Sequence, residues 1–337
     1  MKFQGREAAQ IENEHLRVTV VAAGGHLAEI LHKKSGINPL WQPPWEGMDP
    51  AAFDPSRHTQ YGKGPESKLL AGILGHNLCL DIFGPTSVEE AKAGLTDHGE
   101  GSVAAYTLTA SAAEIHAVSQ FPLAGLRFER TIRLVEHSPS VRVSETVENL
   151  LSFDRPIAWT QHVTLGPPFL ENGVTQFRHN GARSQVFGPP DFGQSDLLAG
   201  AEFTWPNAPQ RDGGSVDLST FPANSPAARF TTHLMDPDSD QAFFTASHPK
   251  LGFSIGYRWQ RSDFPWLGIW EESRSRPNAP WNGQTVACGL EFGVSPFPET
   301  RRATVDRGRL FGVPTYRWLP AHGSLHVEYS IAEEFEG

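Results

Sequence analysis

Cysteine is scarce in this sequence, since only Cys79 and Cys288 occur among 337 residues. Two cysteines cannot build the disulfide framework of a small secreted domain or a zinc site made of several thiolates. Both lie in apolar stretches, and two interpretations are open: one disulfide, or two buried thiols in a reducing compartment. We favour the thiols, which predicts a cytoplasmic protein.

Long apolar runs and excess positive charge are also absent. No stretch approaches the roughly 20 apolar residues of a membrane span, and Met1–Gln10 lacks the apolar segment of a secretory signal. Lys and Arg number 28 against 38 Asp and Glu, which gives a formal net charge of −10. Such an acidic chain is poorly suited to nucleic acid or to an anionic membrane. We expect neither partner, and a neutral small ligand instead.

Turn-forming residues, by contrast, are plentiful. The 32 glycines and 27 prolines divide the chain into many short segments. Most of these segments have the length and the alternating or apolar pattern of strands. The predicted strands are Leu16–Val21, Leu27–Leu31, Val103–Ala110, Leu126–Val135, Val141–Leu150, Pro156–Thr164, Ala228–Leu234, Gln241–Ser247, Gly252–Trp259, Trp266–Glu271, Thr285–Gly293 and Leu325–Ile331.

Helix signals are few. Ser87–Ala93 is the clearest, with Ser87 and Glu90 in the positions of a capping box. Two long segments, Asn38–Lys68 and Phe169–Ala199, read as loops that carry function or cover a site. The sequence predicts an all-β chain, a large antiparallel β-sandwich with very little helix, and a single domain over residues 1–337.

One hairpin can be predicted down to its register. Leu126–Val135 and Val141–Leu150 both alternate apolar and polar residues, and a turn separates them. A turn centred between His137 and Ser138 places Arg130 opposite Glu145 on the apolar face. A charge on an apolar face is costly unless it is paired, so we expect these two residues to form a cross-strand ion pair.

A carboxylate stands among small residues late in the chain. In Val286–Gly293, strand alternation places Glu291 on one face with Ala287, Gly289 and Gly293. Glycine inside a strand often marks the close approach of a ligand. The alternative is an ordinary glutamate that faces solvent, and the small neighbours favour a site.

Two histidines lie in other polar segments. Pleating puts His162 on the same face as Thr160 and Thr164, which leaves room for a polar ligand. His98 lies in Thr96–Gly101, just before a predicted strand. Each also has a structural interpretation, as a hydrogen-bonded strand histidine and as part of a polar turn.

Taken in order, these segments resemble those of the aldose 1-epimerase (galactose mutarotase) family. His98 matches the family's His-Gly turn, His162 its mid-chain strand histidine, and Glu291 its late strand glutamate. The stretch Leu70–Gly84 is similar to the family's early Gly-x-x-x-Gly-Arg region, with His76 in the place of the arginine. The resemblance extends loosely from Leu16 to Ile331 and implies the galactose mutarotase-type sandwich.

The resemblance also implies a reaction. Interconversion of α and β anomers of an aldose opens and recloses the sugar ring, and it needs one base, one acid and no cofactor. The family pattern implies Glu291 as the base and His162 as the acid, with His98 stabilising charge or holding the substrate. The expected partner is a monosaccharide, and the expected assembly is a monomer or a homodimer.

The sequence indicates the substrate-binding residues less directly than the catalytic ones. We expect His76 or Asn77 at the rim of the site and Arg274 near the sugar. A tryptophan could stack on the sugar face, and Trp270 is the one we assign to substrate binding. The candidates are Trp41, Trp45, Trp266, Trp270 and Trp281.

Other functions remain open. A phosphosugar mutarotase would need an arginine cluster for the phosphate, for which Arg274, Arg276, Arg301 and Arg302 are available. A sugar-binding protein without catalysis is a second alternative, because His76 replaces the family's arginine. A metal site built from His76, His98, Glu100 and His162 is a third, although their spacing fits no known metal motif. A lyase or hydrolase on the same scaffold is a fourth, since fold does not fix function.

Overall fold

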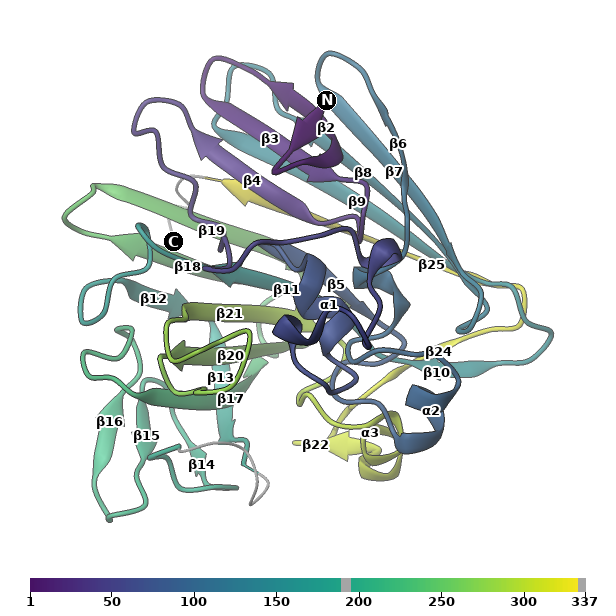
Figure 1. The fold of residues 1–337 in the computed structure, drawn as a ribbon. Helices are drawn as coiled ribbons and strands as arrows, with labels where there is room; N and C mark the ends of the chain where they lie inside the picture. Colours follow the sequence, from purple (N-terminus) through teal and green to yellow (C-terminus); the bar gives the residue numbers. More distant parts are fainter. Residues whose placement is uncertain (189–194, 333–337) are drawn as a thin grey trace.

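The computed structural model describes residues 1–188 and 195–332. It consists of two large antiparallel sheets packed face to face (Figure 1). Strands make up 46% of the chain and helices 8%, which confirms the predicted β-sandwich with very little helix. No helix in the described part is long and apolar enough to cross a membrane.

The first sheet has eleven strands, and β11 lies near its middle. Their spatial order is β1 (Lys2–Phe3), β2 (Arg6–Glu12), β3 (Leu16–Val21), β4 (Leu27–His32), β5 (His76–Leu80), β11 (Trp159–Leu165), β21 (Val286–Gly293), β20 (Trp266–Ser273), β17 (Ala227–Met235), β13 (Gly181–Val186) and β14 (Glu202–Phe203).

The second sheet has eight strands. Their order is β12 (Gln176–His179), β18 (Gln241–His248), β19 (Phe253–Gln260), β25 (Ser324–Ala332), β9 (Ser140–Asn149), β8 (Leu126–Leu134), β7 (Glu114–Phe121) and β6 (Thr107–Ala110). Three two-stranded pairs complete the β-structure: β10 (Arg155–Ile157) with β24 (Arg317–Leu319), β15 (Asn207–Pro209) with β16 (Ser215–Asp217), and β22 (Arg309–Leu310) with β23 (Val313–Pro314).

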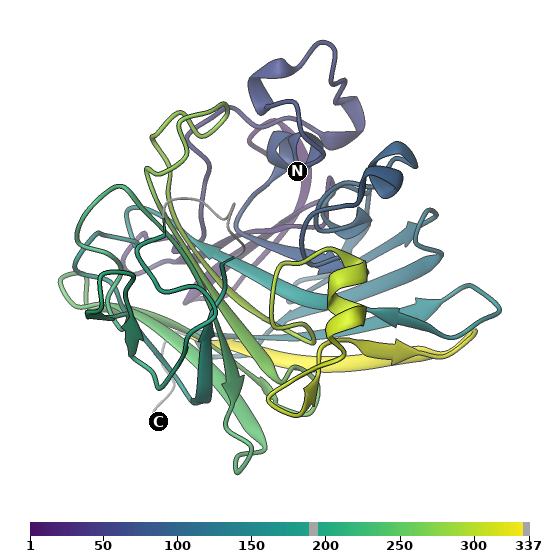
Figure 2. The same ribbon diagram turned by 90° about the horizontal axis from the view of Figure 1, so that it is seen from below.

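The helices are short and lie in the connections, on the same side of the molecule (Figures 1 and 2). They are α1 (Ser67–Gly72), α2 (Val88–Lys92) and α3 (Arg301–Arg307), with single 3₁₀ turns at Pro50–Ala52, Thr59–Tyr61 and Glu100–Ser102. The predicted helix near Ser87 is α2. Ser87 and Glu90 form the expected capping box, in which each side chain bonds the other residue's backbone N–H.

Two details of the predicted elements need correction. Phe169–Ala199 is not an unbroken loop, because its polar residues alternate with buried ones and form the strands β12 and β13; residues 189–194 lie outside the described residues. Cys79 and Cys288 are both buried and unpaired, so the disulfide interpretation is wrong. The two thiols point to opposite faces of the same sheet, since Cys79 packs in the apolar cluster outside the sheet and Cys288 in the core between the sheets.

The main core fills the space between the two sheets. Alternate residues of the central strands point into it, such as Val163 and Leu165 of β11, which are fully removed from solvent. Aromatic rings dominate the centre, where Trp259 of β19 stacks on Phe292 of β21 with 4.3 Å between ring centres. Burial of such large apolar side chains provides most of the driving force for packing the sheets.

A buried polar network crosses this core. Arg130 and Glu145 face each other on β8 and β9, in the predicted register, and Nε of Arg130 lies 2.7 Å from Oε1 of Glu145. Glu145 also accepts hydrogen bonds from Gln161 and Trp159 of β11, and from Tyr329 of β25. The network therefore joins the eight-stranded sheet to the back of β11, whose opposite face carries His162.

Candidate active site

Three neighbouring strands bring the predicted groups into one row. Antiparallel pairing places Asn77 of β5 opposite His162 of β11, and His162 opposite Glu291 of β21. Directly opposed residues of antiparallel strands point to the same face of a sheet. That face is the outer one, because the alternate residues of β11, such as Val163, fill the core. The pleat thus separates the residues that hold the sheets together from those of the site.

His162 and Glu291 are in direct contact. Nε2 of His162 lies 3.1 Å from Oε1 of Glu291, and Nδ1 lies 3.0 Å from Oγ1 of Thr164. Their side chains are only 8% and 2% exposed, so little water competes for these contacts. Thr164 and Glu291 together fix the orientation of the imidazole ring.

The small residues near Glu291 make room for it. A Cβ at Gly289 would lie 2.3 Å from Oε1 of Glu291. Gly268 of β20 is paired with Glu291, and a Cβ there would lie 2.7 Å from the ring of Phe230. A side chain at either position would force a neighbour to shift, and Gly289 is the glycine that leaves room for the Glu291 carboxylate.

His98 reaches the same place from a turn. Its φ is +66° and that of the following Gly99 is +79°, so the chain bends sharply here. Its ring lies 5.5 Å from that of His162, edge to face, and Nδ1 lies 3.1 Å from Sγ of Cys79. Burial raises the pKa of the Cys79 thiol well above its usual value. The thiol therefore stays protonated and can donate to Nδ1 in the tautomer of His98 that carries the ring proton on Nε2.

Burial also governs the protonation of the central pair. It raises the pKa of Glu291 well above its usual value and lowers that of His162 to about 3. Both shifts favour the form of the pair without net charge. At neutral pH the two groups consequently hold one proton between them, and the pair offers one donor and one acceptor.

A cavity of about 310 Å³ opens beside these groups. Its lining includes His98, His162 and Glu291, and its walls are mainly apolar. The other lining residues are Trp41, Glu66, Leu69, Leu70, Ile73, Gly84, Pro85, Asp97, Phe187, Phe230, Trp270, Arg276, Trp281 and Pro298. Its volume lies at the lower end of small-molecule sites, which span about 300–1,000 Å³.

Tryptophans from two loops and one strand wall the cavity. Trp41 and Trp281 lie nearly parallel with 6.1 Å between ring centres, and Trp270 of β20 meets Trp281 edge to face at 6.0 Å. Trp45 packs against both Trp41 and Trp281 from outside the lining. Flat indole faces of this kind suit the C–H faces of a sugar ring. Trp266, the remaining candidate, is fully buried and does not line the cavity.

Two of the expected substrate-binding residues lie elsewhere. His76 points to the inner face, where Nε2 lies 3.0 Å from Oε1 of Gln161, because it is offset by one residue from Asn77 on β5. Arg274 is exposed, and one of its guanidinium nitrogens lies 3.5 Å from Oγ of Ser225. Placement of both residues at the site is therefore wrong.

The other two expected substrate-binding residues, Asn77 and Trp270, lie on the same face as the site. Trp270 lines the cavity as expected. Asn77 is on the correct face, yet it is buried beneath the lining, where Oδ1 accepts a hydrogen bond from Ser102 at 3.2 Å.

The alternative sets of residues do not assemble. Glu100 accepts a hydrogen bond from the backbone N–H of Ala124, and His76 lies on the opposite face, so the four-residue metal set is dispersed. Of the four arginines considered for a phosphate, only Arg276 lines the cavity. Arg301 is held by Asp81 and Glu90.

Some lining residues escaped sequence analysis. Glu66 and Asp97 carry no periodic pattern, and only their neighbours in sequence gave a signal, since Asp97 precedes His98. Cys79 does not line the cavity but contacts His98, and strand alternation already places it on the same face as Asn77. Residues such as Phe187 and Pro298 reach the cavity through tertiary packing, which no local pattern encodes.

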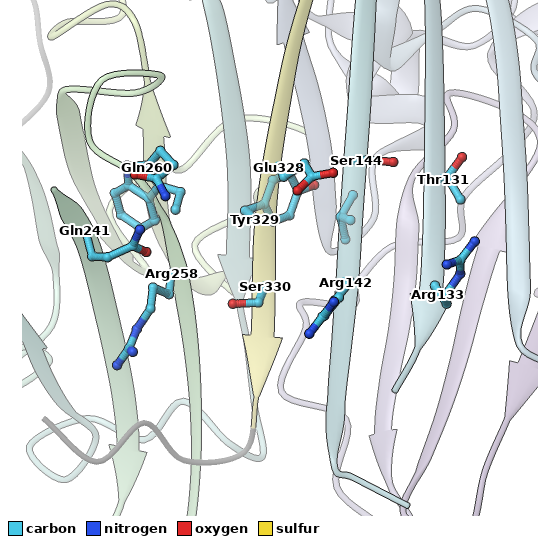
Figure 3. Close-up of a pocket in the computed structure, with 12 residues that line it drawn as sticks. Thr131, Arg133, Arg142, Ser144, Gln241, Arg258, Gln260, Glu328, Tyr329 and Ser330 are labelled. Carbon is cyan, nitrogen blue, oxygen red and sulfur yellow. The ribbon is translucent and has the colours of Figure 1, made fainter. Parts of the chain in front are cut away.

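A larger hollow of about 680 Å³ lies on the outer face of the eight-stranded sheet (Figure 3). Arg258, Arg142 and Arg133 lie across it on neighbouring strands, with Ser330 between the first two. It shares no lining residue with the cavity beside Glu291. The predicted groups thus mark the smaller of the two spaces.

Buried histidines should make the protein sensitive to acid. Burial lowers the pKa of His26, His162 and His179 to about 3, and those of His76 and His233 well below the usual value. The unfolded chain binds these protons from about pH 6.5 downward and the folded chain does not, so stability falls between pH 6.5 and 3 by about 1.4 kcal/mol per pH unit for each histidine.

Carboxyl groups whose pKa is raised by burial oppose this loss over part of the range; they are Glu66, Asp81, Glu100, Asp263, Glu271 and Glu291. Burial raises the pKa of Glu271 to about 7 and that of Glu291 above its usual value, so each favours the folded state as pH falls towards 4.5. The effect of the carboxyls ends near their usual pKa values of about 4, whereas the histidines keep lowering the stability down to about pH 3, so the net stability should fall most steeply below about pH 4.5. Urea unfolding followed by circular dichroism at several pH values measures this slope. His179→Asn should make it shallower by about 1.4 kcal/mol per pH unit; an unchanged slope would show that His179 titrates normally.

Comparison with known proteins gives the fold. No protein-family description matches the chain, and no curated protein matches it either. Several solved structures do match the chain. A candidate aldose 1-epimerase from Klebsiella pneumoniae matches over 95% of this chain and 77% of its own, with a TM-score of 0.68 and 16% identity.

Two further structures match over nearly their whole length. A candidate aldose 1-epimerase from Escherichia coli K12 has a TM-score of 0.63 and 14% identity, and covers 98% of this chain and 99% of its own. A galactose mutarotase-like protein from Clostridium acetobutylicum has a TM-score of 0.62 and 15% identity, and covers 99% and 98%. The chain has the galactose mutarotase-type fold.

Proposed function

We propose that this chain is an aldose 1-epimerase, which interconverts the α and β anomers of a monosaccharide without a cofactor. The observation that carries the proposal is the contact of His162 with Glu291, which line one cavity together with His98. A proton donor and a proton acceptor side by side are what ring opening requires. Tryptophan faces beside them suit a pyranose ring.

The proposed reaction conserves the single proton of the pair. A bound sugar whose O1 hydroxyl donates to Glu291 stabilises the carboxylate, and the proton then resides on Nε2 of His162. Glu291 takes the O1 proton, His162 gives its proton to the ring oxygen O5, the C1–O5 bond breaks and a C1 aldehyde forms. Rotation about C1–C2 and the reverse transfers close the ring as the other anomer.

His98 has a supporting role in this proposal. With its ring proton on Nε2, it can donate a hydrogen bond to a sugar oxygen as charge develops there.

We further propose that the protein acts in the cytoplasm, where its two buried thiols stay reduced, and that it works as a monomer or a homodimer.

Anomer exchange measured by saturation-transfer NMR tests the proposal. With a panel of aldoses at equilibrium, the protein should transfer saturation between the α and β signals of at least one sugar, faster than the same sugar in buffer. Quenching of tryptophan fluorescence gives an independent measure of binding. Binding without exchange would favour a sugar-binding protein. The absence of both binding and exchange would refute a carbohydrate function.

A further inference from the structure

The charge of the cavity bears on the substrate it accepts. Among the described residues of the lining, three carry carboxyl groups, namely Glu66, Asp97 and Glu291, and Arg276 is the only arginine or lysine. Burial raises the pKa of Glu66, Arg276 opposes this shift, and the charge of Asp97 adds to it, so these three groups are near neighbours. The His162–Glu291 pair carries no net charge, so the negative charge of the cavity comes from Glu66 and Asp97, against the single positive charge of Arg276.

The one cationic group is already engaged. Nε of Arg276 lies 3.4 Å from Oε2 of Glu272, a carboxylate that is only 1% exposed. The guanidinium also lies over two aromatic rings, 4.6 Å from the ring centre of Trp281 and 5.5 Å from that of Trp270. A buried counter-charge and two aromatic faces hold it in place. A phosphate would have to compete with all three partners.

Asp97, the second carboxylate beside Arg276, is also held in place. Its Oδ1 accepts hydrogen bonds from the backbone N–H and the hydroxyl of Thr86, at 2.8 and 2.9 Å. Its charge acts on the adjacent His98, whose pKa is lowered by burial and raised again by Asp97. A carboxylate held in this way cannot rotate out of the site to admit an anion.

We infer that the substrate of this site is an unphosphorylated sugar, and that Glu66 and Asp97 select against anionic sugars and in favour of cationic ones. The inference rests on the proposed function and narrows its substrate class. The physical basis is Coulombic: a dianion in a cavity with excess carboxylate, walled by apolar residues, meets repulsion that water screens only partly.

Three sugars that differ only at carbon 6 test the inference. Anomer-exchange NMR at low ionic strength compares 6-amino-6-deoxyglucose, glucose and glucose 6-phosphate. The exchange efficiency should fall in that order, with the amino sugar at least roughly 100-fold above the phosphate. Added salt should narrow the ratio. Exchange that is fastest with the phosphate would overturn the inference and leave the mutarotase proposal intact.

Variants assign the selection to the named residues. Replacing Glu66 with Gln and Asp97 with Asn together should reduce the amino-to-phosphate ratio by roughly tenfold or more. Glu136→Gln is the matched control, because its side chain is 89% exposed in the turn between β8 and β9, and it should leave the ratio unchanged. An equal change in both proteins would show that only overall charge matters and would refute the inference.

Binding keeps the two proposals separate. Ligand-observed NMR titrations of the same three sugars need no turnover. If no sugar exchanges anomers, the proposed reaction fails, and the order of binding still decides whether the cavity rejects phosphate. Tighter binding of the phosphate than of glucose would overturn the charge selection in that case too.

Discussion

Glu291→Gln should lower the rate of anomer exchange by about 10²–10⁴-fold, the range typical of a lost acid–base group. Glutamine keeps the size of the side chain and one acceptor oxygen, but its amide cannot take the O1 proton. Ground-state binding depends on many hydroxyl contacts and should change little, so the loss should fall on turnover. Saturation-transfer NMR gives the exchange rate, and fluorescence titration gives the affinity.

The partner of Glu291 supplies the decisive comparison. His162→Asn should cause a loss of similar size, and the double variant should lose much less than the product of the two, because both groups serve one proton-transfer step. Thermal melts of all three variants control for folding. Wild-type exchange by a folded Glu291→Gln protein would remove Glu291 as the base.

Arg130→Met should destabilise the fold by about 3–5 kcal/mol, the cost of leaving a buried carboxylate without its counter-charge. Glu145 would keep its hydrogen bonds from Gln161, Trp159 and Tyr329, but it is only 1% exposed and water cannot replace the guanidinium. Chemical denaturation at pH 7 measures the loss of unfolding free energy.

A neighbouring arginine on the same strand is the control. Arg133 pairs with Glu114 on the outer face, with a side chain that is 65% exposed, and Arg133→Met should cost under about 1 kcal/mol. Adding Glu145→Gln to Arg130→Met should restore part of the lost stability, since a neutral amide needs no counter-charge. Equal losses from Arg130→Met and Arg133→Met would mean that the buried pair contributes no more than a surface pair.

Regular alternation is what made parts of this fold predictable. The β8–β9 hairpin alternates so strictly that the sequence alone gave its register and the Arg130–Glu145 pair. The faces of β11 and β21 followed from the same rule, whereas the meeting of His162 and Glu291 was expected from the family resemblance. Strand β5 gave no such signal, because all five of its residues, His76–Leu80, are buried on both faces. Sequence analysis therefore placed His76 on the wrong face.

Loops set the rest of the site, and their positions depend on distant contacts. Arg274 and Arg276 are two residues apart beyond the end of β20, and nothing in their sequence distinguishes them. The structure selects Arg276 because its guanidinium finds Trp281 and the buried Glu272. Glu66 reaches the cavity because it immediately precedes α1, which packs against the sheet. Tertiary packing determines which loop residue reaches the cavity, and local sequence patterns do not predict it.

The close contact between Gly289 and Glu291 couples these two positions in evolution. A methyl group at residue 289 would lie 2.3 Å from Oε1 of Glu291, so the carboxylate that contacts His162 at 3.1 Å would have to shift. A descendant of this chain should keep glycine at 289 for as long as it uses Glu291, and that glycine becomes dispensable once the carboxylate is lost. The two codons are thus under one shared selection, although only one encodes a group that moves protons.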